Sequence, residues 1–301
     1  MTQRQPWSPA EEALCQLLTE QGRDSAEIAA TFTERGIART QKAISRLKAR
    51  KHWHGKVAPS PFAPLAAPLE AHGDMVIYPD PHCPFHDADW VNRVTDLALK
   101  WGVRQAGIPG DLIDWTAFSV YGRRAGVEAE DEIRAAEQFM RSLAVTFDRV
   151  YYAPGNHEQR LARTVGYALG LDRLSEWWVT RPNVLTTLRK SFWLTSDDRR
   201  YFVVHPRNYS RNPPSNSVRL CAKFHANIIS THSHHVGMAQ DVSGDYVGLD
   251  IGMCAAQWLL DYIQVEVTNN PAMVTAACIV KSGVAVLLTP GNIALYEDLV
   301  V

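Results

Sequence analysis

Aspartate, histidine and asparagine recur in five short clusters between residues 80 and 234. In chain order they are Asp80-Pro-His82, Gly110-Asp111-Leu-Ile-Asp114, Gly155-Asn156-His157-Glu158, an isolated His205, and His232-Ser-His234. Neutral imidazole, carboxylate and amide oxygen are ligands that suit Zn, Mn, Fe or Ni. Alternate residues of an extended stretch project the same way, so Asp80 with His82, or His232 with His234, can contribute ligands to one shared metal site. These residue types therefore predict a metal centre.

Each cluster follows an apolar run that is typical of a β-strand. The five runs cover residues 75–78, 104–108, 150–153, 201–204 and 228–230. Helical patterns lie between them, near residues 88–101 and 130–147, and this alternation predicts an α/β fold. Side chains beyond the carboxyl ends of such strands converge on one crevice. Further β-rich runs predict a second sheet packed on the first, at residues 246–251, 262–268, 273–280 and 284–289.

This ordered set of motifs resembles the calcineurin-like metallophosphoesterase family over about residues 74–268. The sequences DPHCPFHD and GNHEQRLAR look closest to those of bacteriophage and bacterial members. The resemblance implies a two-sheet α/β sandwich flanked by helices, with two divalent metal ions (Mn, Zn, Fe or Ni) at its edge. By motif, one ion would be held by Asp80, His82, Asp111 and His234. The other would be held by Asp111, Asn156, His205 and His232. His157 would face the substrate without being a ligand.

The mechanism implied by this resemblance is attack of a metal-bridged hydroxide on phosphorus, with His157 assisting the leaving group. Asp114 and Glu158 could orient ligands, or hold the strand ends in a purely structural role. Candidate contacts to the substrate phosphate are Arg160, Arg207 and His235. Thr231 stands where the family usually has glycine, and Pro206 follows His205. These departures remove no ligand, but they leave substrate specificity open.

Two further segments of this part of the chain could border the site. Residues 206–217 are expected to form a loop at its rim. Residues 159–200, which include Trp177, Trp178 and Trp193, either cap the site or contribute an aromatic stripe to the core.

Residues 1–56 have a different pattern, that of three short helices. Ser8-Pro9-Ala10-Glu11 is a capping box with proline at the first helical position. Between residues 35 and 56 there are eight basic residues and no acidic one. A cationic third helix is typical of a DNA major-groove reader, although a solvated basic face is the plain alternative.

The order of features over about residues 7–53 resembles a Myb/SANT-like helix-turn-helix domain. Its outer tryptophans, Trp7 and Trp53, would close a shared core. The resemblance implies DNA contacts, for which the candidates are Arg39, Lys42, Arg46 and Arg50. Residues 57–73, rich in Pro and Ala, are expected to link this domain to a catalytic domain at residues 74–301.

The composition of the chain excludes some classes of protein. The 301 residues hold 31 Lys and Arg against 32 Asp and Glu, which excludes a globally basic nucleic-acid binder. No apolar run is long enough to span a membrane and the chain starts without a signal pattern, so a cytoplasmic protein with no membrane partner is expected. The five cysteines are scattered and predict free thiols.

Three functions are compatible with these features. The favoured hypothesis is a phosphodiesterase or nuclease acting on DNA, targeted by the N-terminal domain. The alternative is a phosphatase or phosphodiesterase on nucleotides, cyclic nucleotides or phosphoproteins, with the N-terminal domain used for localisation. The third is a non-catalytic scaffold with a vestigial site, which the complete ligand set disfavours.

Overall fold

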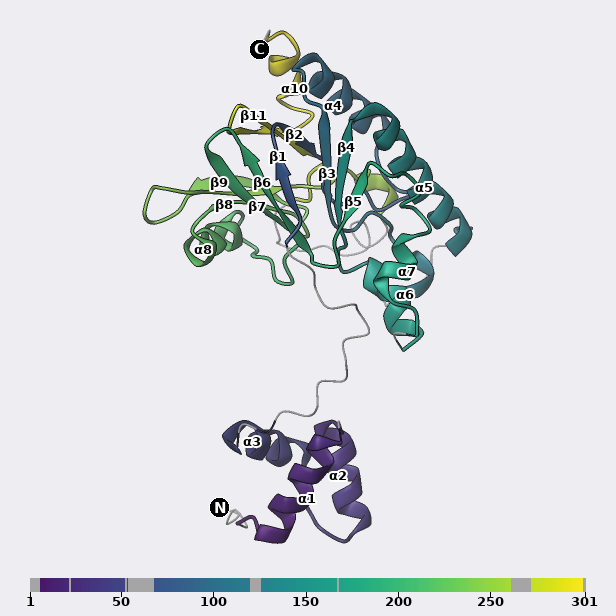
Figure 1. The fold of residues 1–301 in the computed structure, drawn as a ribbon, viewed down its shortest axis with the longest axis vertical. Helices are drawn as coiled ribbons and strands as arrows, with labels where there is room; N and C mark the ends of the chain where they lie inside the picture. Colours follow the sequence, from purple (N-terminus) through teal and green to yellow (C-terminus); the bar gives the residue numbers. More distant parts are fainter. Residues whose placement is uncertain are drawn as a thin grey trace. The chain divides into compact units, whose positions relative to one another are not determined.

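The computed structural model describes residues 6–21, 23–51, 53, 68–119, 126–166, 168–260 and 272–299. The chain divides into two compact units, Met1–Pro64 and Leu65–Val301, which are described separately (Figure 1). The first unit contains the three predicted helices, α1 (Pro9–Glu20), α2 (Ser25–Glu34) and α3 (Gln41–Lys51).

Local hydrogen bonds fix where these helices begin. Ser8 and Glu11 form a reciprocal capping box at α1, and Asp24 and Glu27 form a second one at α2. The Thr40 hydroxyl accepts a hydrogen bond from a backbone N–H at the start of α3. The predicted capping box at Ser8 is therefore confirmed, and similar local hydrogen bonds begin the other two helices.

The three helices share one small core. Its buried members are Cys15, Leu18, Ile28, Phe32, Ile44 and Leu47. Trp7 and Trp53 pack against this cluster from outside, as predicted. Helices of this length are marginal alone, so the shared core is what stabilises each of them.

Arg39 has a structural role in this unit. Its guanidinium donates to both carboxylate oxygens of Glu11, at 2.9 and 3.0 Å, and lies 4.5 Å from the ring centre of Trp7. The Arg39 hydrogen bond is the main cause that lowers the pKa of Glu11 to about 2. Because only 8% of the side chain is exposed, the structure differs from the prediction that Arg39 contacts DNA. Its position depends on how α1 packs, which the local sequence does not reveal.

The second unit is a sandwich of two six-stranded sheets flanked by helices, which confirms the predicted fold class (Figure 1). One sheet has the order β12-β11-β2-β3-β4-β5 and the other β1-β6-β7-β8-β10-β9. The strands of the first are β2 (Met75–Ile77), β3 (Gln105–Pro109), β4 (Arg149–Ala153), β5 (Val184–Thr186), β11 (Ala277–Lys281) and β12 (Val284–Leu288). Those of the second are β1 (Glu70–His72), β6 (Ser191–Ser196), β7 (Arg199–Val204), β8 (Asn227–Ser230), β9 (Val236–Gln240) and β10 (Val247–Ile251).

The partition of strands between the sheets differs from the prediction. The late runs were expected to make a second sheet, but β11 and β12 extend the first sheet because β11 pairs antiparallel with β2. The second sheet instead forms around β7 and β8, which β10 joins in parallel with β8. Strand β1 lies within the predicted linker, where it pairs with β6. The run at residues 262–268 lies outside the described residues.

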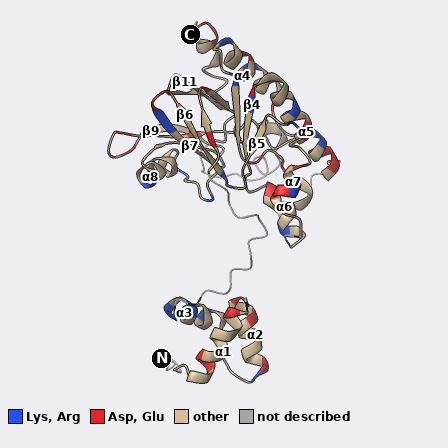
Figure 2. Cartoon of the chain, in the orientation of Figure 1, with Lys and Arg blue, Asp and Glu red and all other residues tan. Residues whose placement is uncertain are grey.

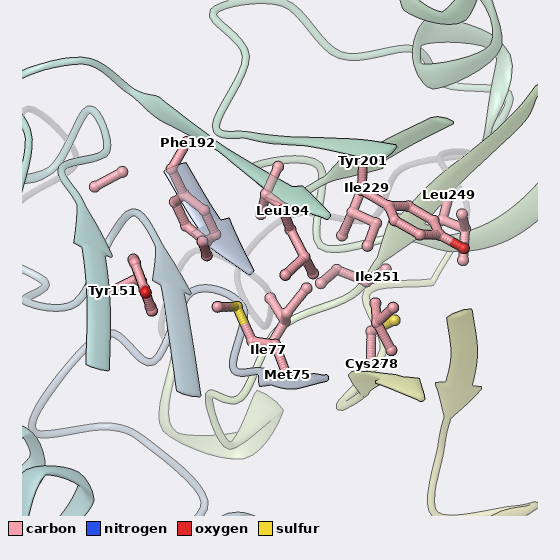
Figure 3. Packing of buried hydrophobic residues seen from close by; sticks show 14 residues of the cluster. Met75, Ile77, Tyr151, Phe192, Leu194, Tyr201, Ile229, Leu249, Ile251 and Cys278 are labelled. Carbon is pink, nitrogen blue, oxygen red and sulfur yellow. The ribbon is translucent and has the colours of Figure 1, made fainter. Parts of the chain in front are cut away.

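The main core fills the space between the sheets (Figure 3). One sheet contributes Met75, Ile77 and Tyr151, among others, and the other contributes Phe192 and Leu249. Side chains of a strand alternate between its faces, so these residues turn inward while their neighbours face the outer helices. Burial of this apolar surface holds the strand ends, and the loops after them, in fixed positions.

Helices cover both outer faces. Helices α4 (Ala88–Lys100) and α5 (Ala129–Thr146) lie on the sheet containing β2, where Tyr78 contacts Thr95 of α4 and Phe139 of α5. Helix α8 (Ser215–Phe224) lies on the other sheet through Cys221. The shorter helical elements are α6 (Glu158–Thr164), α7 (Leu171–Ser175), α10 (Ile293–Glu297) and the 3-10 turns Thr116–Phe118 and Gln257–Leu259.

Residues 159–200 contribute mainly to the fold. They form α6, α7, β5 and β6, and Trp178 is buried while Trp193 on β6 carries the guanidinium of Arg200 at 4.0 Å. In the part of the chain that the structure describes, no helix has the length and apolar character needed to cross a bilayer.

Candidate metal centre

The predicted clusters lie in five loops, each at the carboxyl end of a strand. Asp80 and His82 follow β2, Asp111 follows β3, and Asn156 and His157 follow β4. His205 follows β7, and the His232-Ser-His234 cluster follows β8. Because β7 and β8 belong to the other sheet, the centre is shared by both layers rather than built on one sheet edge.

The structure brings all seven predicted ligands together. The second carboxylate oxygen of Asp111, Oδ2, lies 3.4 Å from Nε2 of His205, and Asn156 Oδ1 lies 2.8 Å from the same nitrogen. Nε2 of His234 is 3.4 Å from Asp80 and 3.1 Å from Nε2 of His82. The set is completed by His232, whose ring centre is 4.8 Å from that of His205.

The structure contains two groups of three residues whose potential ligand atoms, within each group, all lie within 4.8 Å of one another. One comprises Asp111, His205 and His232, and the other comprises Asp111, His82 and His157. Asp111 belongs to both, which is the position expected for a bridging carboxylate. The second group contains His157, which the sequence analysis places outside the ligand set, so the rings of His157 and His82 could together hold one ion.

The ligand loops have unusual backbone conformations. Five of the seven predicted ligands have φ between 39° and 73°, a region that non-glycine residues seldom occupy: Asp80, His82, Asp111, His232 and His234. Each such residue costs about 1–3 kcal/mol, and clusters of them are typical of functional sites. The packed sheets on either side must supply this energy.

Two glycines allow the loops to approach one another. A Cβ at Gly155 would lie 2.0 Å from Oδ1 of Asp111, and one at Gly110 would lie 2.4 Å from Nδ1 of His205. Neither position has room for a side chain without moving a predicted ligand. The close approach of the ligand loops therefore explains why the GDxxD and GNHE motifs have glycine at positions 110 and 155.

Hydrogen bonds orient two of the histidines. Nδ1 of His82 is 2.8 Å from the carboxylate of Asp114, which directs Nε2 into the centre. Nδ1 of His205 is 3.0 Å from Thr231 Oγ1, and that hydroxyl donates to the carbonyl of Pro109 at 3.0 Å. Since a hydroxyl has one proton, Thr231 must accept from Nδ1–H of His205, and Nε2 is left free to bind a metal.

Backbone N–H groups orient the two carboxylates. His232 N donates to Asp80 Oδ2 at 2.7 Å, and His157 N donates to Asp111 Oδ1 at 2.9 Å. Glu158 accepts from Leu112 N and from a backbone N–H of the GNHE loop, so it ties two ligand loops together. Asp114 contacts a ligand directly, whereas Glu158 acts through the backbone.

The pKa values in the centre reflect close contacts between carboxylates and histidine rings. Burial opposes ionisation of Asp111, but the rings of His157 and His205 outweigh it and hold the pKa of Asp111 well below its ordinary value. Burial likewise works against a charged His82, yet Asp114 raises the pKa of His82 above its ordinary value. Carboxylates that raise the pKa of a neighbouring histidine would also attract metal cations.

The donor set fits divalent metal ions. Burial lowers the pKa of His232 to about 4 and that of His234 to about 3, so both rings are neutral and able to bind a metal at pH 7. Oδ1 of Asp80 is buried, makes no well-formed hydrogen bond, and lies 3.3 Å from Nδ1 of His205. Mixed imidazole, carboxylate and amide ligands match Zn, Mn, Fe or Ni.

Of the predicted phosphate contacts, the structure places Arg160 beside the centre. Arg160 is mostly buried, and its Nη1 donates to the carbonyl oxygen of Asp114 at 2.7 Å. Arg207 is exposed. Arg207 lies two residues after the predicted ligand His205 in the chain.

His235 differs from the prediction. Its side chain is buried, with Nδ1 3.3 Å from the carbonyl of Ala272, so it faces the protein rather than the rim. Sequence reasoning missed Tyr209, a largely exposed aromatic beside His232, and Glu132, a buried carboxylate that accepts from Thr116 N. The only sequence signal for Tyr209 is its position between two arginines. The only signal for Glu132 is its position in the first turn of a helix.

No protein-family model and no curated protein matches the sequence. Among solved structures, the chain is similar to Vps29 from Chaetomium thermophilum, with 12% identity over 69% of this chain and 78% of that one and a TM-score of 0.39. It is also similar to Yfce, a phosphoesterase from E. coli, with 15% identity, coverage of 70% and 90%, and a TM-score of 0.38. Vps29 from Cryptosporidium parvum gives 9% identity, coverage of 72% and 95%, and a TM-score of 0.39. At these values, inference about activity depends on the site itself.

Proposed function

We propose that the protein is a metal-dependent phosphoester hydrolase with a binuclear centre. The observation that carries this proposal is the position of Asp111, whose carboxylate belongs to both groups of ligand atoms. A shared carboxylate is what a pair of closely spaced ions requires. The strained ligand loops support the same conclusion, because such conformations persist where a site needs them.

The residues divide between two ions in the way the motifs imply. One ion would bind Asp80, His82, Asp111 and His234, and the other would bind Asp111, Asn156, His205 and His232. When bound, such ions supply Lewis acidity, activating water and neutralising charge on a phosphoryl group. The metal is Mn, Zn, Fe or Ni, selected by supply and geometry rather than by these ligands alone.

The residues around the metal ligands would handle the substrate. Arg160 presents guanidinium N–H groups beside His157, and a guanidinium matches the oxygens of a phosphoryl group well. His157 would stabilise or protonate the leaving oxygen once its ring nitrogen is available. Asp114 contacts both histidine rings, His82 and His157, and would keep their orientation fixed.

We further propose that the substrate is a DNA phosphodiester and that the N-terminal unit binds duplex DNA in the manner of a Myb/SANT-like domain. Lys42, Arg46 and Arg50 of α3 are exposed and spaced four residues apart, which places them along one face. Figure 2 shows basic and no acidic residues on this helix. An exposed cationic helix face can lie in a major groove.

The test of the catalytic proposal is a metal-supplemented substrate panel. It contains a generic phosphodiester, a phosphomonoester, single-stranded and duplex DNA, and cyclic dinucleotides. Metal-dependent hydrolysis that is lost in Asp111→Asn supports the centre, with the exposed Asp172→Asn as a matched control. Hydrolysis that is unaffected by Asp111→Asn, or absent with every metal, contradicts it.

The test of DNA targeting is a triple variant, Lys42→Gln, Arg46→Gln and Arg50→Gln. We expect weaker duplex binding and a smaller dependence of affinity on salt, by about one unit of slope per lost phosphate contact. Removing three exposed arginines from the second unit (Arg134, Arg141 and Arg173) is the control for charge alone. If the α3 variant binds DNA as the wild type does and only small phosphoesters are hydrolysed, the alternative holds: a phosphatase or phosphodiesterase on nucleotides, cyclic nucleotides or phosphoproteins.

A further inference from the structure

The loop between β7 and α8, residues 206–214, has a fixed conformation beside the metal centre. The side-chain amide of Asn216 donates to the carbonyl of Asn208 at 2.8 Å, and Asn212 N donates to Ser210 Oγ at 3.1 Å. Its last two prolines pack on Gly237 of β9, where an added Cβ would lie 3.0 Å from the backbone of Pro213. The loop therefore presents its outward side chains in defined positions.

Tyr209 is the outward aromatic of this loop. Its ring centre lies 5.6 Å from that of His232, at 75° between the planes, yet 53% of the residue is exposed. Its hydroxyl makes no hydrogen bond to the described residues. A large aromatic in contact with a metal ligand but open to solvent has stacking surface that the fold itself does not use.

The chain segment that carries Tyr209 is cationic. The sequence has no Asp or Glu between Arg199 and Gln240. Arg207 and Arg211 flank Tyr209 at alternate positions, and both are exposed without an acidic partner in the described part of the chain. Figure 2 shows basic and no acidic residues on the adjoining α8. An aromatic platform between positive charges is the combination that proteins use to bind single-stranded nucleic acid.

We propose that Tyr209 stacks on the nucleobase next to the phosphate held at the metal centre, while Arg207 and Arg211 contact the flanking phosphates. The substrate of the centre is then a single-stranded nucleic-acid segment. This inference rests on the proposed phosphoester hydrolase. A phosphorylated protein side chain would have no base for Tyr209 and no flanking phosphates for the two arginines.

The test uses two probes that cannot be hydrolysed, because a P–C bond replaces the ester. One is methylphosphonate, and the other is thymidine 5′-phosphonate, in which a methylene group replaces the ester oxygen. Their dissociation constants are measured by calorimetry on the full chain loaded with Mn²⁺ or Zn²⁺. We expect the thymidine probe to bind wild type about tenfold more tightly than methylphosphonate, the order of one stacked base.

Variants at position 209 test whether the ring of Tyr209 causes this difference in affinity between the two probes. Tyr209→Leu is expected to lose the advantage of the thymidine probe and to keep the affinity for methylphosphonate. Tyr209→Trp, which restores a ring, is expected to keep both. The control is Tyr296→Leu, since Tyr296 packs on Trp101 near the amino end of β3, at the opposite end of the strand from the centre.

The outcomes separate the two proposals. If methylphosphonate binds and thymidine adds no affinity, or adds the same affinity in Tyr209→Leu, the stacking role is wrong and the phosphoester centre stands. If neither probe binds the metal-loaded protein, the proposed function is wrong and this inference falls with it.

Discussion

Nη2 of Arg160 lies 2.7 Å from Nε2 of His157. Arginine can only donate, so Nε2 is the acceptor and the ring proton is on Nδ1, which donates to the carbonyl of Asp114 at 2.9 Å. His157 is thus held from both sides. It cannot donate from Nε2 until the guanidinium moves, and a phosphoryl group is an anion that could attract the guanidinium away.

The first prediction concerns this contact. Arg160→Ala should lower kcat/KM for a phosphoester by about tenfold to a hundredfold, because a donor to the phosphoryl oxygens and the support of His157 are lost together. Arg160→Lys should recover only part, since an ammonium lacks the planar fork. Steady-state kinetics measure this, with the exposed Arg173→Ala as control. Unchanged kinetics in Arg160→Ala would refute the role.

The second prediction concerns Thr231. Thr231→Val removes the nearer acceptor for Nδ1 of His205, leaving only Asp80 Oδ1 at 3.3 Å, and should weaken metal binding by about tenfold to a hundredfold. Thr231→Ser keeps the hydroxyl and should bind metal as the wild type does. Competition against a chromophoric chelator gives the affinities, and Thr146→Val on the exposed face of α5 controls for loss of a hydroxyl. Equal affinities in the Val and Ser variants would show that the hydroxyl does not orient His205.

The third prediction separates steric strain from loss of flexibility. Gly155→Ala places a Cβ against Asp111 and should lower the free energy of unfolding by about 1–3 kcal/mol, with loss of metal binding. Gly291→Ala is the matched control, because its nearest contact would be Thr289 Oγ1 at 3.8 Å, and we expect a change within about 0.5 kcal/mol. Denaturant titration measures both. A Gly155→Ala protein with wild-type stability and metal affinity would contradict the close approach.

The fourth prediction concerns the pH dependence of stability. Burial raises the pKa of Glu132 to about 7 from an ordinary 4.5, so between these values the folded protein holds a proton that the unfolded chain releases. The free energy of unfolding should therefore be greatest below pH 4.5, as far as Glu132 contributes, and should fall as pH rises through 7. The full difference is about 3 kcal/mol.

Glu132→Gln tests this contribution, because the amide resembles the protonated acid at every pH. Unfolding of the wild type and of Glu132→Gln at pH 5 and pH 8 should show a smaller fall in the variant. Glu130→Gln, on the same helix but exposed to solvent, is the control. If wild type and Glu132→Gln show the same change between the two pH values, Glu132 does not titrate in this range.

The sequence was most informative where local chemistry decides the structure. The apolar runs before each motif were strands, and the capping box at Ser8 placed the start of the first helix. The metal ligands could be predicted because their types and order are specific. Which sheet a strand joins could not, since β11 pairs with β2 across some 200 residues of chain, and single-strand patterns contain no information on partners.

The same limit applies to individual side chains. Arg39 and Lys42 are both cations near the start of one helix, but packing against α1 gave only Arg39 an acidic partner. His235 follows the last predicted ligand by one residue and was a candidate phosphate contact, yet its side chain is buried against the protein. Burial of a polar side chain depends on tertiary packing, which residue type alone does not specify.

The left-handed backbone at five ligand positions also bears on how this chain tolerates mutation. Glycine at any of them would relax the backbone and remove a ligand at once. A screen for heat resistance alone should therefore enrich proteins that have lost the metal centre, and thermal stability is a misleading guide to which homologues or designed variants keep it.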